Sequence, residues 1–230
     1  VRSNGRNAQS ITADLCVVLG VNEDQYDPER HRVVSNASCT TNSIAPAIKV
    51  LNDAFGIDYL MGTTIHAYTS SQKLVDVPKG GCRKNRAAGL SMIPASTGAA
   101  QALIPLFPDL KGKMAMSAVR VPVADGSLSD LVVHLQKDAN AGEVNEVLRR
   151  SAEERLEGIL EFSTEELVSS DIVGNSHSGI VDSLSTKMLM GRGAKIMIWY
   201  DNEYGYASRL LELARYMAVK EPSMSFSSAR

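Results

Sequence analysis

The sequence of 230 residues lacks any apolar run near the roughly 20 residues that a membrane-spanning helix needs. It also lacks the charged start and short apolar stretch of a signal peptide. Hydrophobic residues make up 44% and charged residues 22%, the balance of an ordinary globular protein. We therefore expect a domain, or a domain and a half, whose core needs no disulfide and no structural metal.

The sequence also has no large excess of positive or negative residues, with 24 Lys and Arg against 26 Asp and Glu. The formal net charge is −2, which argues against electrostatic binding to nucleic acid or to an anionic membrane. The three cysteines, Cys16, Cys39 and Cys82, are an odd number without the spacing of a metal site. They are typical of free thiols in a reducing cytoplasm, and we expect a cytoplasmic protein without a bound metal.

The periodicity of the apolar residues predicts an α+β sheet domain and not a series of βαβ units. The expected strands are 15–19, 32–34, 62–66, 114–121, 131–136 and 194–200. The expected helices are 42–55, one opened by the capping pair Asn140 and Glu143, and 206–217. Pro46 fits the first of these helices only near its first turn. Residues 68–89 carry no periodicity, and so long a polar loop is usually functional or disordered.

Cys39 lies where a short strand runs directly into a helix start, in Ser35-Asn36-Ala37-Ser38-Cys39-Thr40-Thr41-Asn42. A thiol there faces free backbone N–H groups and the positive end of the helix dipole, and both favour the thiolate. A cysteine is often only a small buried residue. The hydroxyl and amide neighbours of Cys39 favour a nucleophile instead.

These eight residues resemble the active-site signature of glyceraldehyde-3-phosphate dehydrogenases. Segments 63–69, 94–100, 119–122 and 199–206 resemble that family in the same order, and the similarity covers about residues 20–220. The resemblance implies a mostly antiparallel mixed sheet with helices on one face. It also implies an oxidoreductase of glycolysis and gluconeogenesis that converts D-glyceraldehyde 3-phosphate with NAD and inorganic phosphate.

The resemblance makes Cys39 the nucleophile that forms a thioester, and His66 its base and ion-pair partner. Imidazole suits proton transfer near neutral pH, although a lone histidine is more often structural or at the surface. His31, His134 and His177 have no comparable neighbours, and we expect them at the surface.

Two anion sites are also implied by the resemblance, although a single Ser or Thr is more often a cap or turn residue. One consists of Ser38, Thr40, Thr97 and Gly98, and the other of Thr69 and Arg120. An arginine inside an apolar strand needs an anionic partner, unless that face of the strand is open to water.

Lys84 stands where many bacterial members carry an arginine that contacts the substrate phosphate. A lysine keeps the charge but lacks the bidentate fork of arginine, and Arg83 or Arg86 are the cations that could compensate. The run Val-Ala-Asp-Gly-Ser at 123–127 also departs from the family, and the sequence assigns it no role.

Members of the family begin with a Rossmann domain whose Gly-x-Gly-x-x-Gly turn seats a dinucleotide, and no such turn occurs here. We expect a remnant of that domain at 1–38, the catalytic domain at 39–201, and at 202–230 a C-terminal helix that would pack back on the Rossmann domain. Asn202 and Tyr206 correspond to contacts of the nicotinamide. NAD is the expected coenzyme, and NADP stays open.

Other hypotheses stay open beside this one. An erythrose-4-phosphate dehydrogenase would differ in its aldehyde, although Tyr68-Thr69 favours the triose. A fragment without coenzyme would keep only an esterase-like thiol, and a non-catalytic module would use the surface that faces the Rossmann domain. The expected partners are a small phosphorylated aldehyde and inorganic phosphate, with neither nucleic acid nor membrane. The full-length form is expected to be a homotetramer, and the start at Val1 suggests part of a longer protein.

Overall fold

The computed structural model describes residues 13–78, 83 and 85–220. Cys82 and Lys84 lie outside these ranges, so the expected phosphate contact of Lys84 stays a prediction. Within the described segments, no helix combines the length and the apolar character that crossing a membrane requires.

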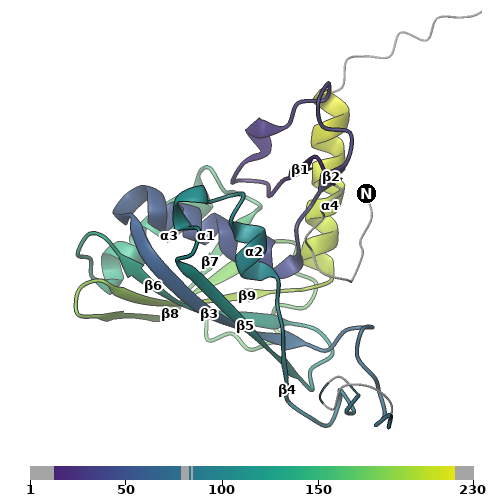
Figure 1. Ribbon diagram of the computed structural model, residues 1–230. Helices are drawn as coiled ribbons and strands as arrows, with labels where there is room; N and C mark the ends of the chain where they lie inside the picture. The colour runs from purple at the N-terminus through teal and green to yellow at the C-terminus, as the bar shows by residue number, and fades with distance from the viewer. Residues whose placement is uncertain (1–12, 79–82, 84, 221–230) are drawn as a thin grey trace, which may run out of the picture.

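A seven-stranded sheet forms the body of the molecule, with the strand order β4-β5-β3-β6-β9-β8-β7 (Figure 1). Its strands are β3 (Ile57–Ala67), β4 (Ile93–Ala95), β5 (Met114–Val121), β6 (Ser127–Leu135), β7 (Leu160–Ser163), β8 (Gly179–Leu189) and β9 (Gly193–Tyr200). The pairs β3–β5 and β7–β8 are parallel, and the other four neighbouring pairs are antiparallel. The expected mostly antiparallel mixed sheet is therefore confirmed.

Helices cover one face of this sheet, as predicted (Figure 1). They are α1 (Cys39–Phe55), α2 (Ala99–Leu103) and α3 (Ala141–Glu153), and short 3-10 turns lie at Glu23–Gln25 and Pro108–Leu110. The predicted capping box starts α3, because Asn140 Oδ1 accepts the Glu143 N–H at 3.0 Å and Glu143 Oε2 accepts the Asn140 N–H at 2.8 Å.

Alternation along the strands separates a buried face from an open face. Leu131 and Val133 of β6 are fully buried under the helices, whereas Val132 between them is 45% exposed. Ile44 and Ile48 of α1 are fully buried in the same core, one helical turn apart. Apolar packing on the sheet therefore fixes the helix that begins at Cys39.

The last helix stands away from the sheet. It is α4 (Tyr204–Lys220), beside the short parallel pair β1 (Leu15–Cys16) and β2 (Val34–Ser35) (Figure 1). Leu213 of α4 is buried in a small second core that includes Val17. Arg209, only 1% exposed, donates from Nη1 to the Gly158 carbonyl at 3.0 Å. The helix thus joins the N-terminal segment to the sheet domain.

One prediction about α1 is wrong. The helix begins at Cys39 and not at Asn42, because the Ser38 side chain caps it. Pro46 therefore lies well inside the helix and not near its first turn. A proline there has no N–H for the carbonyl four residues earlier, and the packing of a fully buried segment compensates for that lost hydrogen bond.

The strands also differ from the prediction in extent. The strands expected at 15–19 and 32–34 are reduced to the two-residue β1 and β2, and β3 begins five residues earlier than expected, at Ile57. The sequence did not predict β4, β7, β8 or α2. The first four residues of β8 are all buried, so this strand lacks the two-residue alternation of a half-exposed strand.

Gly179 allows β8 to approach α1 closely. A Cβ at this position would lie 2.6 Å from the Ser43 carbonyl oxygen of α1. We predict that Gly179→Ala lowers the free energy of unfolding by about 1–3 kcal/mol, because backbone must move. Urea denaturation measures this. Gly89→Ala is the matched control, since a Cβ there meets no atom within 4 Å, and equal losses in both variants would contradict the prediction.

Candidate active site

Cys39 is the first residue of the 17-residue helix α1. Ala37 has a left-handed backbone with a φ of 52°, which turns the chain into the helix. Ser38 Oγ then accepts the Thr41 N–H at 3.1 Å and caps the helix. The thiol is half-buried and lies at the helix N-terminus, where the sequence places it.

His66 lies one residue before the end of β3 and is 4% exposed. Its Nε2 atom is 3.4 Å from Cys39 Sγ, within the hydrogen-bond range of sulfur. The fold thus joins two residues 27 positions apart in the sequence. The geometry required of a nucleophile and its base is present.

Arg120 lies on β5, whose parallel register with β3 pairs it with His66. Its Nη1 atom is 2.6 Å from His66 Nδ1 and 2.8 Å from the Ala67 carbonyl oxygen. The guanidinium is half-buried. The half-exposed guanidinium thus contacts the imidazole and a carbonyl, and its expected anionic partner stays a prediction.

Burial is the largest cause of the pKa shifts of both Cys39 and His66. It raises the pKa of the Cys39 thiol, and hydrogen bonds from Thr40 and the charge of Arg120 oppose this shift only in part. Burial, followed by the charge of Arg120, lowers the pKa of His66 to about 4. Both shifts favour the uncharged thiol and the uncharged imidazole. The expected thiolate–imidazolium ion pair stays a prediction.

Tyr200 is a residue of the site that the sequence did not suggest. Its hydroxyl lies 2.9 Å from Thr40 Oγ1 and 2.6 Å from Thr64 Oγ1, and its ring meets that of His66 edge-on at 5.8 Å. Burial raises the pKa of Tyr200. The sequence signals were its place in the family-like segment 199–206 and in the strand expected at 194–200.

The expected anion-binding residues occupy different environments. Thr40 is buried and its hydroxyl contacts Tyr200, so the structure gives that hydroxyl a supporting role. Ser38 Oγ caps α1 and also lies 2.8 Å from Thr41 Oγ1. Thr69 follows β3 three residues after His66, and its hydroxyl lies 2.9 Å from Ser71 Oγ.

Thr97 and Gly98 directly precede α2, which lies beside α1. Thr97 Oγ1 accepts the Ala99 N–H at 3.2 Å. Gly98 is exposed, with open space where a side chain would lie. This helix start is accessible to a ligand.

Asn202 and Tyr206, the expected nicotinamide contacts, lie at the start of α4. Ser127 Oγ donates to Asn202 Oδ1 at 2.7 Å, whereas Asn202 Nδ2 is buried without a hydrogen-bond partner. Tyr206 is half-buried, and burial raises its pKa. The described part of the chain, 13–78, 83 and 85–220, includes no cluster of three or more His, Cys, Asp or Glu side chains able to hold a metal.

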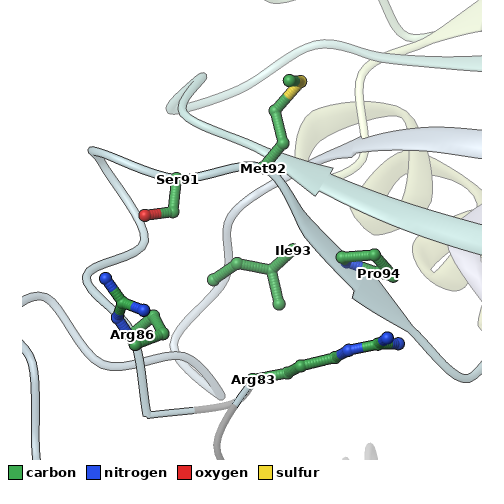
Figure 2. Close-up of a pocket in the computed structure, with 6 residues that line it drawn as sticks. All are labelled: Arg83, Arg86, Ser91, Met92, Ile93 and Pro94. Atoms are coloured by element: carbon green, nitrogen blue, oxygen red, sulfur yellow. The ribbon is translucent and has the colours of Figure 1, made fainter.

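A cavity of about 320 Å³ lies beside β4, and Figure 2 shows its lining. It is lined by Arg83, Arg86, Ser91, Met92, Ile93 and Pro94. The Arg83 side chain extends toward Pro94, while Arg86 lies nearer Ser91 (Figure 2). Arg86 also forms a 3.3 Å ion pair with Asp76. Arg83 and Arg86, the two cations that could compensate for the lack of an arginine at position 84, thus both line this cavity.

The raised pKa of the Cys39 thiol predicts how its alkylation rate depends on pH. We predict that iodoacetamide alkylates Cys39 with a midpoint above the roughly 8.5 of an ordinary cysteine, because burial disfavours the thiolate. Mass spectrometry of the Cys39 peptide separates this rate from those of Cys16 and Cys82. Cys39→Ser identifies the signal. A midpoint below pH 7 would show that the ion pair exists.

The pKa of His66 is a second test. We predict an NMR titration midpoint near pH 4 and a higher midpoint in Arg120→Met, because that variant removes a positive charge beside the ring. Arg192→Met is the control, since it loses only a surface ion pair with Asp138. An unchanged midpoint in Arg120→Met would refute the electrostatic role of Arg120.

Comparisons with known proteins assign the family. The family model described as glyceraldehyde 3-phosphate dehydrogenase, C-terminal domain, matches residues 38–202. The chain is 50% identical to glyceraldehyde-3-phosphate dehydrogenase 2 of Bacillus subtilis, over 91% of this chain and 62% of that protein. It is 48% identical to the enzyme of Priestia megaterium, over 93% of this chain and 64% of that protein. The chain thus spans slightly less than two thirds of these relatives, and it belongs to the glyceraldehyde-3-phosphate dehydrogenase family, whose C-terminal domain it contains.

Proposed function

We propose that this chain carries the catalytic site of an NAD-dependent, phosphorylating glyceraldehyde-3-phosphate dehydrogenase of glycolysis and gluconeogenesis. The observation that supports this most directly is the 3.4 Å contact between Cys39 Sγ and His66 Nε2 at the start of α1. The names of the relatives support the same reaction.

In this reaction Cys39 attacks the aldehyde carbon, and its proton passes to His66. Backbone N–H groups at the start of α1 stabilise the oxyanion. The proton on His66 passes to that oxyanion and gives the hydroxyl of the hemithioacetal, and His66 accepts it again as the intermediate is oxidised to a thioester on Cys39. Inorganic phosphate cleaves the thioester and frees the thiol. NAD, when bound, supplies the hydride acceptor.

The residues near the start of α4 fit a nicotinamide carboxamide. The unpartnered Asn202 Nδ2 is a buried donor, and a carboxamide oxygen would satisfy it. Tyr206 offers a half-buried ring beside it along the helix. We further propose that residues 1–38 end the NAD-binding domain, that 39–201 form the catalytic domain, and that residues 202–230 pack back on the NAD-binding domain.

For the two anion sites we assign Ser38, Thr40, Thr97 and Gly98 to one, and Thr69 and Arg120 to the other, with Lys84 as a further contact of the substrate phosphate. The Thr40 hydroxyl also lies 2.9 Å from the Tyr200 hydroxyl. Among these groups, the half-buried guanidinium of Arg120 donates the strongest hydrogen bonds to an anion.

A fusion tests the proposal, with the part of the Bacillus subtilis relative that precedes the matched region placed before Ala13. We predict NADH formation with D-glyceraldehyde 3-phosphate that requires phosphate. Cys39→Ser should lower the rate on the order of 10⁴-fold or more, and His66→Asn about 10²- to 10⁴-fold.

Substitutions at the surface provide the control for this experiment. Arg192→Met should retain the full rate, because Arg192 contacts only Asp138 at the surface. If NADH forms faster with erythrose 4-phosphate than with D-glyceraldehyde 3-phosphate, erythrose 4-phosphate is the substrate. A fold-competent fusion that forms no NADH with either aldehyde would refute the proposed function.

A further inference from the structure

Tyr200 ends β9 and reaches across the sheet to the strand that carries His66. Its hydroxyl lies 2.6 Å from Thr64 Oγ1 on β3, although β6 lies between the two strands (Figure 1). Ser129 of β6 is paired with Thr64, so the two side chains lie on the same face of the sheet, and both are buried. The small serine leaves room for the phenol ring, which has to cross β6 to reach Thr64.

The same hydroxyl contacts the helix that carries Cys39. It lies 2.9 Å from Oγ1 of Thr40, which directly follows Cys39 in α1. Thr64 precedes His66 by two residues in β3, so these two side chains point to the same face of the strand. One hydroxyl therefore joins a neighbour of the proposed nucleophile to a neighbour of the proposed base. It bridges sequence separations of 160 and 136 positions.

The ring of Tyr200 contacts the imidazole of His66 as well. The two ring centroids lie 5.8 Å apart, and the ring planes meet at 83°. Aromatic rings prefer this edge-on arrangement at centroid distances of about 4.5–7 Å. Tyr200 is 1% exposed, so its ring is held by the packing around it. A fixed ring beside the imidazole restricts the rotation of the His66 side chain.

We propose that Tyr200 is a positioning residue, whose hydroxyl fixes the spacing between Cys39 and His66 and whose ring fixes the orientation of the imidazole. This inference rests on the proposed function, in which His66 accepts the proton of Cys39. The contact between Cys39 Sγ and His66 Nε2 is 3.4 Å long. Proton transfer depends steeply on such a distance, and a misplacement of about 1 Å can cost on the order of 10²-fold in rate.

Tyr200 acts through its neighbours and does not exchange a proton with the reacting groups. Burial raises the pKa of Tyr200, so its hydroxyl keeps its proton near neutral pH. Across the described segments, this hydroxyl has no hydrogen bond to Cys39 Sγ or to a ring nitrogen of His66. Its two partners, Thr40 and Thr64, are themselves buried. A buried hydroxyl that loses its partner is costly, so removal of either end should disturb the bridge.

Two variants of the fusion enzyme remove opposite ends of this bridge. Tyr200→Phe keeps the ring and loses its hydroxyl, whereas Thr64→Val keeps the shape of the side chain and loses the hydroxyl on β3. Each should lower kcat about 10- to 100-fold and leave the KM values for aldehyde and phosphate within about threefold. Thr63→Val is the matched control and should retain the full kcat, because the Thr63 hydroxyl contacts Ser117 on the open face of the sheet.

A second background separates positioning from a merely structural role. In His66→Asn no imidazole remains to be positioned, so Tyr200→Phe should lower kcat there by less than about twofold. Alkylation of Cys39 by iodoacetamide at pH 7.5 makes the same comparison on the unfused chain, without coenzyme. Tyr200→Phe should lower that rate at least about threefold when His66 is present, and should leave it unchanged in His66→Asn.

The outcomes distinguish this inference from the proposed function. Thermal melting first verifies that each variant is folded. Equal losses in both backgrounds, or full rates in both Tyr200→Phe and Thr64→Val, would overturn the inference and leave the proposed reaction intact. A fusion that forms no NADH would refute the proposed reaction, and the alkylation rates would then decide the positioning role of Tyr200 on their own.

Discussion

The parallel register between β3 and β5 is the constraint on which the site depends. It pairs His66 with Arg120, so that one guanidinium contacts both the imidazole and the carbonyl at the end of β3. A shift of one residue would direct Arg120 to the opposite face of the sheet. Both strands are held in place by the apolar core under α1, so the packing that positions Cys39 also positions His66.

Burial and the helix dipole act on Cys39 in opposite directions. A helix N-terminus typically stabilises an anion by about 0.3–1 kcal/mol, less than the 1.36 kcal/mol of one pKa unit. Burial can shift a pKa by up to about 3–5 units. The pKa of the Cys39 thiol is raised, in agreement with this difference. For Cys39, the effect of burial on the pKa therefore outweighs that of its position at a helix start.

The run at 123–127, to which the sequence assigned no role, has a structural explanation. Gly126 adopts a φ of 88°, and a Cβ there would lie 2.4 Å from the Ser169 carbonyl oxygen. Ser127, next in the chain, accepts the Ala67 N–H at 3.1 Å and donates to Asn202. This turn therefore links the strand end that holds His66 to the start of α4. The proposed nicotinamide contact Asn202 and the end of the strand that carries His66 are therefore parts of one hydrogen-bonded unit.

The sequence by itself determined the fold class, the helix that begins near Cys39, the capping box of α3 and the membership of the family. These features depend on local patterns, since a cap, an apolar period and an eight-residue motif are each read within one segment. Only the tertiary structure decided the contact between Cys39 and His66, the contacts of Arg120 and the place of Tyr200 beside them. Each of these results from burial and from contacts between strands far apart in the chain, and neither the local dielectric nor the strand register is encoded in any single segment.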